Sequence, residues 1–270
     1  MHLFCHRLAE AQKAANTALC VGLDPDMFRL PAGIPQTLAG MRYFLETVIA
    51  TALPHCIAFK PNISFFEAMG IEGLQLLKDM RSRVPSTTPW IIDAKRGDIG
   101  NTSVMQARFL FDVLGADAVT LHPYMGEDSV VPFFEFRDKF SFVLGLTSNI
   151  GSQQFQKQKM ANGTCLYEVV LSQISAWRTS FGNVGAVVGA TQDALSAIRK
   201  VDPDLLMLVP GVGAQGGDYG DVVKNGKNRD GLVLVNVSRG VLYDPSDNTQ
   251  NFECNIRQRL SIYSDMPTPK

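Results

Sequence analysis

The chain has 270 residues, 46% of them hydrophobic and 19% charged, which is typical of a globular protein with an ample core. Its formal net charge of −1 argues against a nucleic-acid partner and a membrane surface, because both are usually bound by basic faces. An odd number of cysteines, no signal-peptide pattern and no apolar run of about 18 residues together predict a cytoplasmic protein with reduced thiols.

Strand-like and helix-like segments alternate along the whole chain. After an amphipathic helix at 3–16, short aliphatic runs predict strands at 18–23, 56–59, 89–94, 117–121, 142–147, 184–189, 205–209 and 232–237. Helical patterns follow them at 36–53, 67–82, 103–114, 128–138, 165–180, 191–200, 218–225 and 249–263. Segment 149–163 is polar and has no periodicity, so we expect a loop there.

This alternation predicts the fold class. The strands are nearly continuous aliphatic runs, as in sheets that are buried on both faces, and strand–helix alternation favours a parallel sheet. Eight such units in a chain of this length predict a single-domain (β/α)8 TIM barrel over residues 1–270, in which 264–270 form a frayed tail. A doubly wound open sheet is the alternative.

Polar residues stand repeatedly where the predicted strands end, at the rim that carries the chemistry of barrels. These residues are Asp24, Lys60, Asp93, Lys95, His122, Thr147 and Ser148. Asp93 and Lys95 are two positions apart, so both should project from one face of an extended strand, and Asp98 follows shortly after. A single Asp-x-Lys is more often a structural ion pair, but several polar strand ends on one rim favour a functional site. We assign no role to His122.

Two segments near the end of the chain predict a phosphate site. Segment 210–218 contains four glycines, which leave backbone N–H groups unshielded. The next strand ends in Ser238, Arg239 and Gly240, which add a guanidinium and further free amides. Barrels commonly hold a phosphate between the loops that follow strands seven and eight. The pairing of these segments therefore favours phosphate binding, although Gly-x-Gly alone is weak support.

Together the motifs resemble those of orotidine 5′-phosphate decarboxylase, in its longer bacterial branch. The resemblance spans residues 18 to 242 and rests on segments 21–25, 59–62, 93–102, 210–217 and 238–240, in order and in the matching strands. It implies decarboxylation of orotidine 5′-phosphate to UMP, the last step of pyrimidine synthesis, without a metal or another cofactor. One departure is Asn149-Ile150-Gly151 after Ser148, where the family often has Pro-Gly.

The resemblance also implies roles for individual residues. The catalytic Lys-Asp-Lys-Asp array of the family is matched by Lys60, Asp93, Lys95 and Asp98. In the family, the residues that match Asp98, Ile99 and Thr102 reach into the neighbouring subunit's site, which implies a homodimer. The implied substrate-binding residues are Asp24 for the ribose, Ser148 for the pyrimidine, and Pro210, Gly211, Gln215, Ser238, Arg239 and Gly240 around the phosphate.

Two other functions remain as alternatives. Related sugar-phosphate decarboxylases and aldolases share the Asp-x-Lys-x-x-Asp motif but bind Mg²⁺, with a glutamate where Lys60 stands. An ammonium group at that position would repel the metal ion. The second alternative is an inactive phosphate-binding barrel, which the presence of all four charged residues does not favour.

Overall fold

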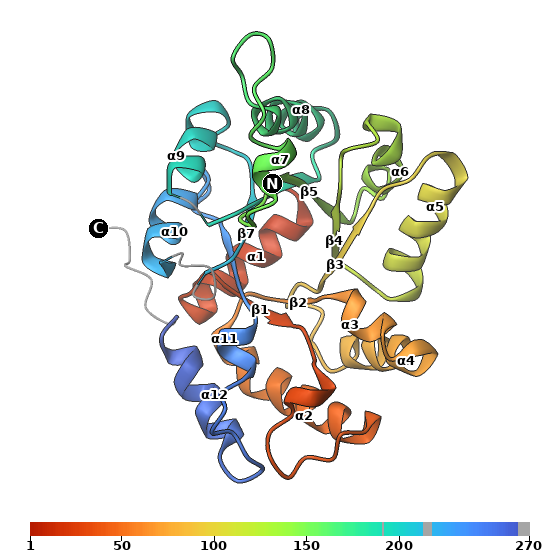
Figure 1. Ribbon diagram of the computed structural model, residues 1–270, viewed down its shortest axis with the longest axis vertical. Helices are drawn as coiled ribbons and strands as arrows, with labels where there is room; N and C mark the ends of the chain where they lie inside the picture. Colours follow the sequence, from red (N-terminus) through yellow and green to blue (C-terminus); the bar gives the residue numbers. More distant parts are fainter. Residues whose placement is uncertain (191, 213–217, 264–270) are drawn as a thin grey trace.

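In the computed structural model, which describes residues 1–190, 192–212 and 218–263, a parallel barrel is surrounded by helices (Figure 1). Within these ranges the eight strands follow the order β2-β1-β8-β7-β6-β5-β4-β3. Isolated parallel bridges between Phe59 and Trp90 and between Asn62 and Asp93 join β2 to β3. These bridges nearly close the barrel, so the prediction of a (β/α)8 barrel is confirmed and the open sheet is excluded.

The strands lie close to their predicted positions. Their bounds are β1 Leu19–Leu23, β2 Ala58–Pro61, β3 Ile91–Arg96, β4 Ala118–Leu121, β5 Phe140–Leu146, β6 Val184–Val188, β7 Met207–Pro210 and β8 Leu234–Val237. The difference between predicted and observed bounds that matters most for the site is in β3. This strand continues two residues beyond the predicted end at 94 and thus includes Lys95. The next helix, α5 (Gly100–Arg108), also begins three residues before the predicted start at 103.

The longer helices occupy the outside of the barrel. Their bounds are α1 Leu3–Ala15, α2 Leu38–Ala52, α4 Gly70–Arg81, α8 Leu166–Phe181, α9 Gln192–Val201, α10 Tyr219–Gly226 and α12 Phe252–Ser261. Shorter helical segments are α3 Ile63–Glu67, α6 Val131–Phe134, α7 Ser152–Phe155 and α11 Arg239–Leu242, the 3-10 turns Met27–Arg29, Leu53–His55 and Glu127–Ser129, and a π-helical segment at Phe109–Val113. The predicted frayed tail, 264–270, lies outside the described residues.

Two helix predictions and one loop prediction differ in detail from the structure. The helix predicted at 67–82 is α4, which begins only at Gly70; the φ of +73° at Gly70 separates it from the short α3. The helix predicted at 128–138 is only the short α6, because Asn183 Nδ2 donates to the carbonyls of Phe134, Phe136 and Lys139 and holds this segment in another path. The predicted loop at 149–163 contains α7, which Gln156 fastens to the end of β5.

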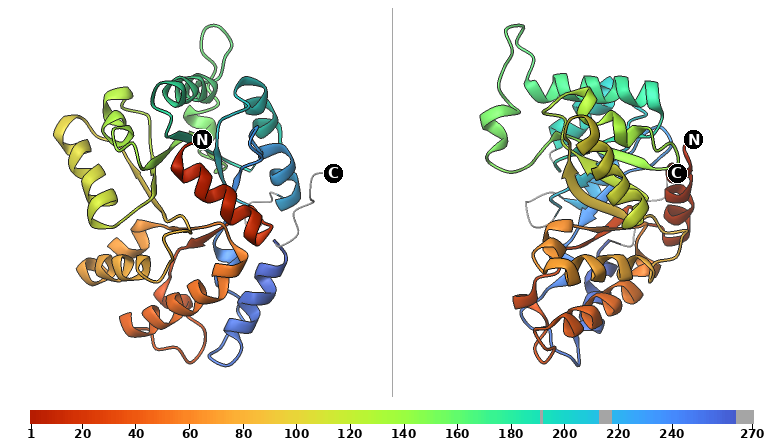
Figure 2. Two further views of the ribbon diagram at one scale, coloured as in Figure 1. Left: turned by 180° about the vertical axis from the view of Figure 1, so that it is seen from behind. Right: turned by 90° about the vertical axis from the view of Figure 1, so that its right-hand side faces the viewer.

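Helix α1 covers one end of the barrel, where it lies across the opening (Figure 2, left). Its buried residues Phe4 and Leu8 belong to the same apolar cluster as Phe140 and Phe142 of β5 inside the barrel. The rings of Phe4 and Phe140 are stacked with 4.9 Å between their centroids. Seen from the side, α7 and the hairpin after it project on the opposite side of the barrel (Figure 2, right). The chemistry is therefore expected at the end that α1 leaves open.

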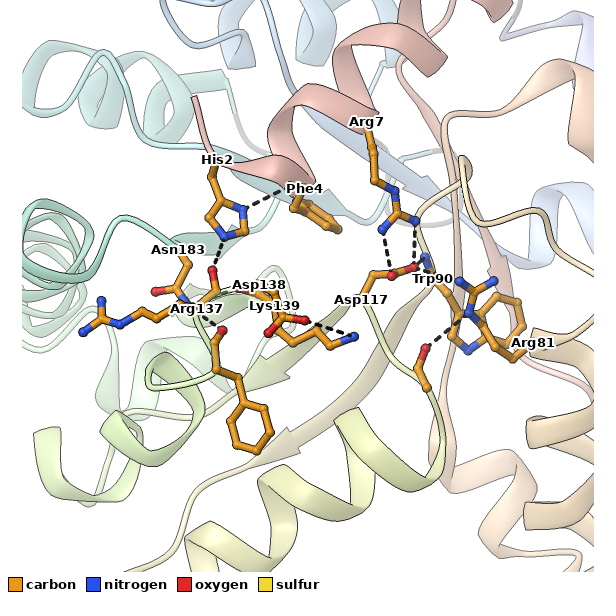
Figure 3. A network of polar contacts seen from close by, with 12 residues as sticks. His2, Phe4, Arg7, Arg81, Trp90, Asp117, Arg137, Asp138, Lys139 and Asn183 are labelled. Atoms are coloured by element: carbon orange, nitrogen blue, oxygen red, sulfur yellow. Dashed lines mark hydrogen bonds and ion pairs between the residues drawn. The ribbon is translucent and has the colours of Figure 1, made fainter.

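The charged residues beneath α1 form a structural network. Asp117, just before β4, accepts hydrogen bonds from both terminal nitrogens of Arg7 at 2.8 and 3.0 Å (Figure 3). It also accepts from Arg81 at 3.4 Å and from the backbone N–H of Trp90 at 2.9 Å. Because these partners come from α1, α4 and the segment before β3, this carboxylate joins three parts of the fold at the closed end.

Candidate active site

Asp93 stands between two lysines at the end of β3. Lys60 Nζ on β2 donates to Asp93 Oδ2 at 2.8 Å, and Lys95 Nζ donates to Asp93 Oδ1 at 2.6 Å. The exposed fractions of the three side chains are 4% for Lys60, 12% for Asp93 and 48% for Lys95. One ammonium group is therefore buried in the barrel, while the other reaches solvent. The structure brings together three of the four residues predicted to be catalytic.

The charges in this cluster hold one another in their ionised forms. Burial alone would lower the pKa of the Lys60 ammonium, but the nearby Asp93 and Asp24 carboxylates outweigh it and raise that pKa. Burial would likewise raise the pKa of the Asp93 carboxyl, but Lys60 and Lys95 hold it well below its usual range. Asp93 is therefore a carboxylate and Lys60 an ammonium over the whole neutral pH range.

Thr120 on β4 is a member of the cluster that the sequence reasoning did not identify. Its hydroxyl donates to Asp93 Oδ1 at 2.8 Å and accepts the backbone N–H groups of Ala94 and Lys95, each at 3.0 Å. Lys95 itself has φ +45°, in the left-handed region, so the backbone is not regularly extended at this residue, although its side chain still meets Asp93 as expected from their spacing. The pairing of β3 with β4 shifts register between Ile92 and Arg96, which accommodates this conformation.

Asp98, Ile99 and Thr102 do not join this cluster within the described part of the chain. One Asp98 oxygen accepts the N–H of Ile99 at 2.8 Å, and none of the ion pairs among the described residues includes Asp98. Ile99 and Thr102 are both exposed, at the start of α5. Asp98 is thus the one predicted catalytic residue that lies apart from the other three.

At the ends of β1 and β8, three buried polar atoms lack a hydrogen-bond partner among the described residues. These atoms are Asp24 Oδ1, Asn236 Oδ1 and Ser238 Oγ. The two strands approach closely here, since a Cβ added to Gly22 would lie 2.6 Å from Ser238 Cβ. Buried polar atoms without partners are unfavourable in a free protein, so they mark a place where a polar ligand can bind. Of the three, the sequence reasoning did not identify Asn236.

The predicted phosphate residues gather at the neighbouring ends of β7 and β8. Pro210 and Asn236 are paired in the sheet, so Gly211, Ser238, Arg239 and Gly240 follow adjacent strand ends. Arg239 is exposed, and its guanidinium has no ion-pair partner among the described residues. Gln215 lies outside the described residues.

Ser148, the residue predicted to face the pyrimidine, is exposed two residues after the end of β5. The neighbouring Thr147 is held by Gln156, whose amide oxygen accepts the Thr147 N–H and whose amide nitrogen donates to the Thr147 hydroxyl, both at 2.7 Å. These two hydrogen bonds tie Gln156 to Thr147, so the residues between them, Ser148 included, form a loop that is closed at the rim of the barrel.

Comparison with known proteins gives a consistent result. The sequence model of the orotidine 5'-phosphate decarboxylase / HUMPS family matches residues 17–253. The chain belongs to this family. It is 43% identical over 250 residues to an orotidine 5'-phosphate decarboxylase of Phocaeicola vulgatus, with 91% of each chain covered. It is 45% identical to one of Porphyromonas gingivalis over 87% of this chain and 85% of that one.

A solved structure agrees with the family assignment. OMP decarboxylase of Leishmania donovani superposes with a TM-score of 0.81 at 36% sequence identity, and the alignment covers 97% of this chain and 98% of that one. The predicted resemblance to orotidine 5'-phosphate decarboxylase is thus confirmed, and so is the expectation of an enzyme, since the relatives are named as decarboxylases, a class of carbon–carbon lyase.

Two further findings concern metal sites and membrane spans in this member of the orotidine 5'-phosphate decarboxylase / HUMPS family. Among the described residues, no three or more histidine, cysteine or acidic side chains are grouped so that they could hold a metal ion. The helices described here include none that is long and apolar enough to cross a membrane.

Cys20 lies inside the barrel, and burial raises the pKa of its thiol to about 12, so it stays protonated and is not a nucleophile.

Proposed function

We propose that this chain decarboxylates orotidine 5′-phosphate to UMP and CO2. The observation that carries the proposal is the Lys60–Asp93–Lys95 cluster, in a chain whose relatives are named for this reaction. Two cations on one carboxylate, one buried and one reaching solvent, provide a fixed charge pattern at the open end of the barrel. Such preorganised charge is what a reaction through an anionic intermediate requires.

The proposed chemistry needs no cofactor. When the bond between C6 and the carboxylate breaks, its electron pair remains on C6 of the pyrimidine, where no adjacent carbonyl can accept it. Lys95 would stabilise this carbanion as an ammonium and then transfer a proton from Nζ to C6, after which solvent restores the proton. Asp93 accepts the Lys95 ammonium and would lie near the substrate carboxylate, while Lys60 donates to Asp93 and would contact the ribose.

Substrate binding would use the other polar groups of the rim. Asp24 Oδ1 and Ser238 Oγ, which lack a hydrogen-bond partner among the described residues, suit the ribose and phosphate, and Ser148 suits the pyrimidine. The proposed phosphate site consists of Pro210, Gly211, Gln215, Ser238, Arg239 and Gly240. Because this site is remote from C6, phosphate binding energy would be available to favour the transition state.

We further propose that the enzyme is a homodimer in which Asp98, Ile99 and Thr102 serve the neighbouring site. Asp98 stands apart from the lysine–aspartate cluster of its own chain, and Ile99 is 57% exposed although it is apolar. Nearby on the rim, an apolar cavity of about 680 Å³ is lined by residues that include Tyr124, Leu144 and Phe155. Exposed apolar surface of this kind is typical of an interface.

The expected location is the cytoplasm, with no nucleic-acid or membrane partner.

The Mg²⁺-dependent alternative is disfavoured by the donor set. Both oxygens of Asp93 already accept hydrogen bonds from ammonium groups, at 2.8 and 2.6 Å, and Lys60 stands where the relatives that bind Mg²⁺ have a glutamate. A divalent cation at this carboxylate would meet two positive charges. No observation favours an inactive barrel over an active one.

One assay separates these functions. The purified protein is mixed with orotidine 5′-phosphate, and the loss of pyrimidine absorbance is followed with and without EDTA. Turnover that EDTA leaves unchanged is the expected result. Turnover abolished by EDTA and restored by Mg²⁺ would point to the metal-dependent relatives, and tight UMP binding without turnover would point to an inactive barrel.

A further inference from the structure

The hydroxyl of Thr120 on β4 forms hydrogen bonds with three residues of β3 at the proposed site. Thr120 is 1% exposed and stands in the middle of β4. Its Oγ1 lies 3.0 Å from the backbone nitrogens of both Ala94 and Lys95, and 2.8 Å from Asp93 Oδ1. A hydroxyl has one proton and two lone pairs, so these three hydrogen bonds use its whole capacity.

The three partners fix the direction of every hydrogen bond. Backbone N–H groups can only donate, so both lone pairs of Thr120 Oγ1 are occupied by Ala94 and Lys95. The hydroxyl proton is therefore directed at Asp93 Oδ1, the same oxygen that accepts the Lys95 ammonium at 2.6 Å. Thr120 thus holds both the backbone of Lys95 and the carboxylate that its side chain contacts.

The backbone conformation of Lys95 explains why these hydrogen bonds are needed. Its φ of +45° is unfavourable for a residue with a Cβ, so the surroundings must impose it. The β3–β4 ladder is interrupted between Ile92 and Arg96, so the hydroxyl supplies an acceptor where the regular pairing stops. Without that acceptor, the buried N–H of Ala94 and the partly buried N–H of Lys95 would lack a partner, and the strained conformation would lose its support.

We propose that Thr120 is a positioning residue, which keeps Lys95 in its left-handed conformation and fixes the acceptor oxygen of Asp93. This inference rests on the proposed function, in which Lys95 protonates C6. Because Thr120 acts on the proton donor and has no assigned contact with the substrate, its loss should lower kcat and leave KM nearly unchanged. A displacement of about 1 Å at a reacting group can reduce the rate on the order of a hundredfold.

The test compares four proteins: the natural chain, Thr120→Val, Thr120→Ser and Thr17→Val. Valine keeps the shape but removes the hydroxyl, whereas serine keeps the hydroxyl and removes the methyl group. Thr17 is a matched control, because it is fully buried before β1 and its Oγ1 contacts the Tyr263 carbonyl, the Tyr219 hydroxyl and the Leu19 N–H. Thr17→Val therefore removes comparable hydrogen bonds away from Asp93.

The expected result is a loss of kcat of about a hundredfold in Thr120→Val, with KM and the Kd for UMP within a few-fold. Thr120→Ser should recover most of kcat, and Thr17→Val should lower Tm with kcat nearly unchanged. The inference is overturned if kcat of Thr120→Val stays within about twofold of the natural chain, or if Thr120→Ser is as impaired as Thr120→Val. A raised KM with unchanged kcat would also overturn it, because it would make Thr120 a binding residue.

Crystal structures of the natural chain and Thr120→Val separate this inference from the proposed function. We expect the backbone of Lys95 to return to negative φ in the variant, and its ammonium to leave Asp93 Oδ1. If the natural chain does not turn over orotidine 5′-phosphate, the proposed function fails, and the structures alone decide the role of Thr120. An unchanged positive φ and Nζ–Oδ1 contact in Thr120→Val would then overturn it.

Discussion

Lys60 Nζ donates a hydrogen bond to Asp93 Oδ2 at 2.8 Å, although the lysine side chain is almost completely buried. A buried charge is stable only when it is paired, so each of the two residues needs the other to remain ionised. Asp93 can therefore keep its negative charge in the barrel and still attract the Lys95 ammonium on its second oxygen. This pairing is the physical basis for a fixed cation at the proposed site.

The first prediction concerns the pH dependence of stability. The folded-state pKa of Asp93 is held below its usual value, so its stabilising effect is present above the unfolded pKa of about 3.9 and is lost as the pH falls through the folded-state pKa. Lys60 has a raised pKa, so its effect is present below about pH 10.4 and is lost as the pH rises through the folded-state pKa. Urea unfolding of the natural chain and of Asp93→Asn at several pH values measures the contribution of Asp93 to the free energy of unfolding.

The difference in unfolding free energy between these two proteins should be largest near neutral pH and should shrink as the pH falls below about 4. Glu253→Gln is the matched control, because this residue pairs with Arg257 on the exposed face of α12. A difference for Asp93→Asn that does not change with pH would contradict the proposed charge state of the pair.

The second prediction concerns the proton donor. Lys95→Ala should reduce turnover of orotidine 5′-phosphate by about 10³-fold or more, because it removes both the cation and the proton. The affinity for UMP should change little, since the phosphate and ribose contacts lie on other strands. Steady-state kinetics and calorimetry with UMP measure the two effects. Near-normal turnover in Lys95→Ala would remove this residue as the proton donor.

The third prediction places the phosphate. Arg239→Ala should weaken UMP binding roughly 10–100-fold, which is the range expected for one lost charge-assisted hydrogen bond. Uridine, which has no phosphate, is the control ligand, and its affinity should be the same for both proteins. If UMP binds the variant as tightly as the natural chain, the phosphate lies elsewhere.

The fourth prediction tests sharing of sites between subunits. Lys95→Ala and Asp98→Ala chains are each expected to be nearly inactive as homodimers. In a mixed dimer, one site has both defects and the other has neither, so mixing under conditions that exchange subunits should recover about a quarter of natural activity. If activity does not return although exchange is demonstrated with labelled chains, Asp98 acts within its own chain.

The fifth prediction concerns the closed end of the barrel. Arg7→Met should lower the unfolding free energy by about 1–3 kcal/mol, because it removes two hydrogen bonds to the mostly buried Asp117 carboxylate. Arg83→Met is the control, since Arg83 and Glu46 form a surface ion pair, and such pairs contribute about 0–1 kcal/mol to stability. Chemical denaturation measures both. Equal losses in the two variants would show that the Asp117 network does not anchor α1.

The sequence by itself determined the barrel and the rim on which the polar residues lie. Strand–helix alternation repeats along the chain, and polar residues such as Lys60 and Asp93 follow aliphatic runs, so their place in a barrel follows from strand direction alone. These are local patterns. That Lys60 and Asp93 belong to one array was implied by the resemblance to the family, and the structure shows them in contact.

Only the tertiary structure decided the conformation of Lys95 and the part played by Thr120. A threonine in an aliphatic run has no local signal of a polar role, because its partners are 25 to 27 residues away in sequence. The φ of +45° at Lys95 is equally hidden, since the register shift between β3 and β4 imposes it against the residue's own preference. The same holds for α6, which ends early because Asn183, 49 residues further along, takes the Phe134 carbonyl. Long-range hydrogen bonds decided each of these features.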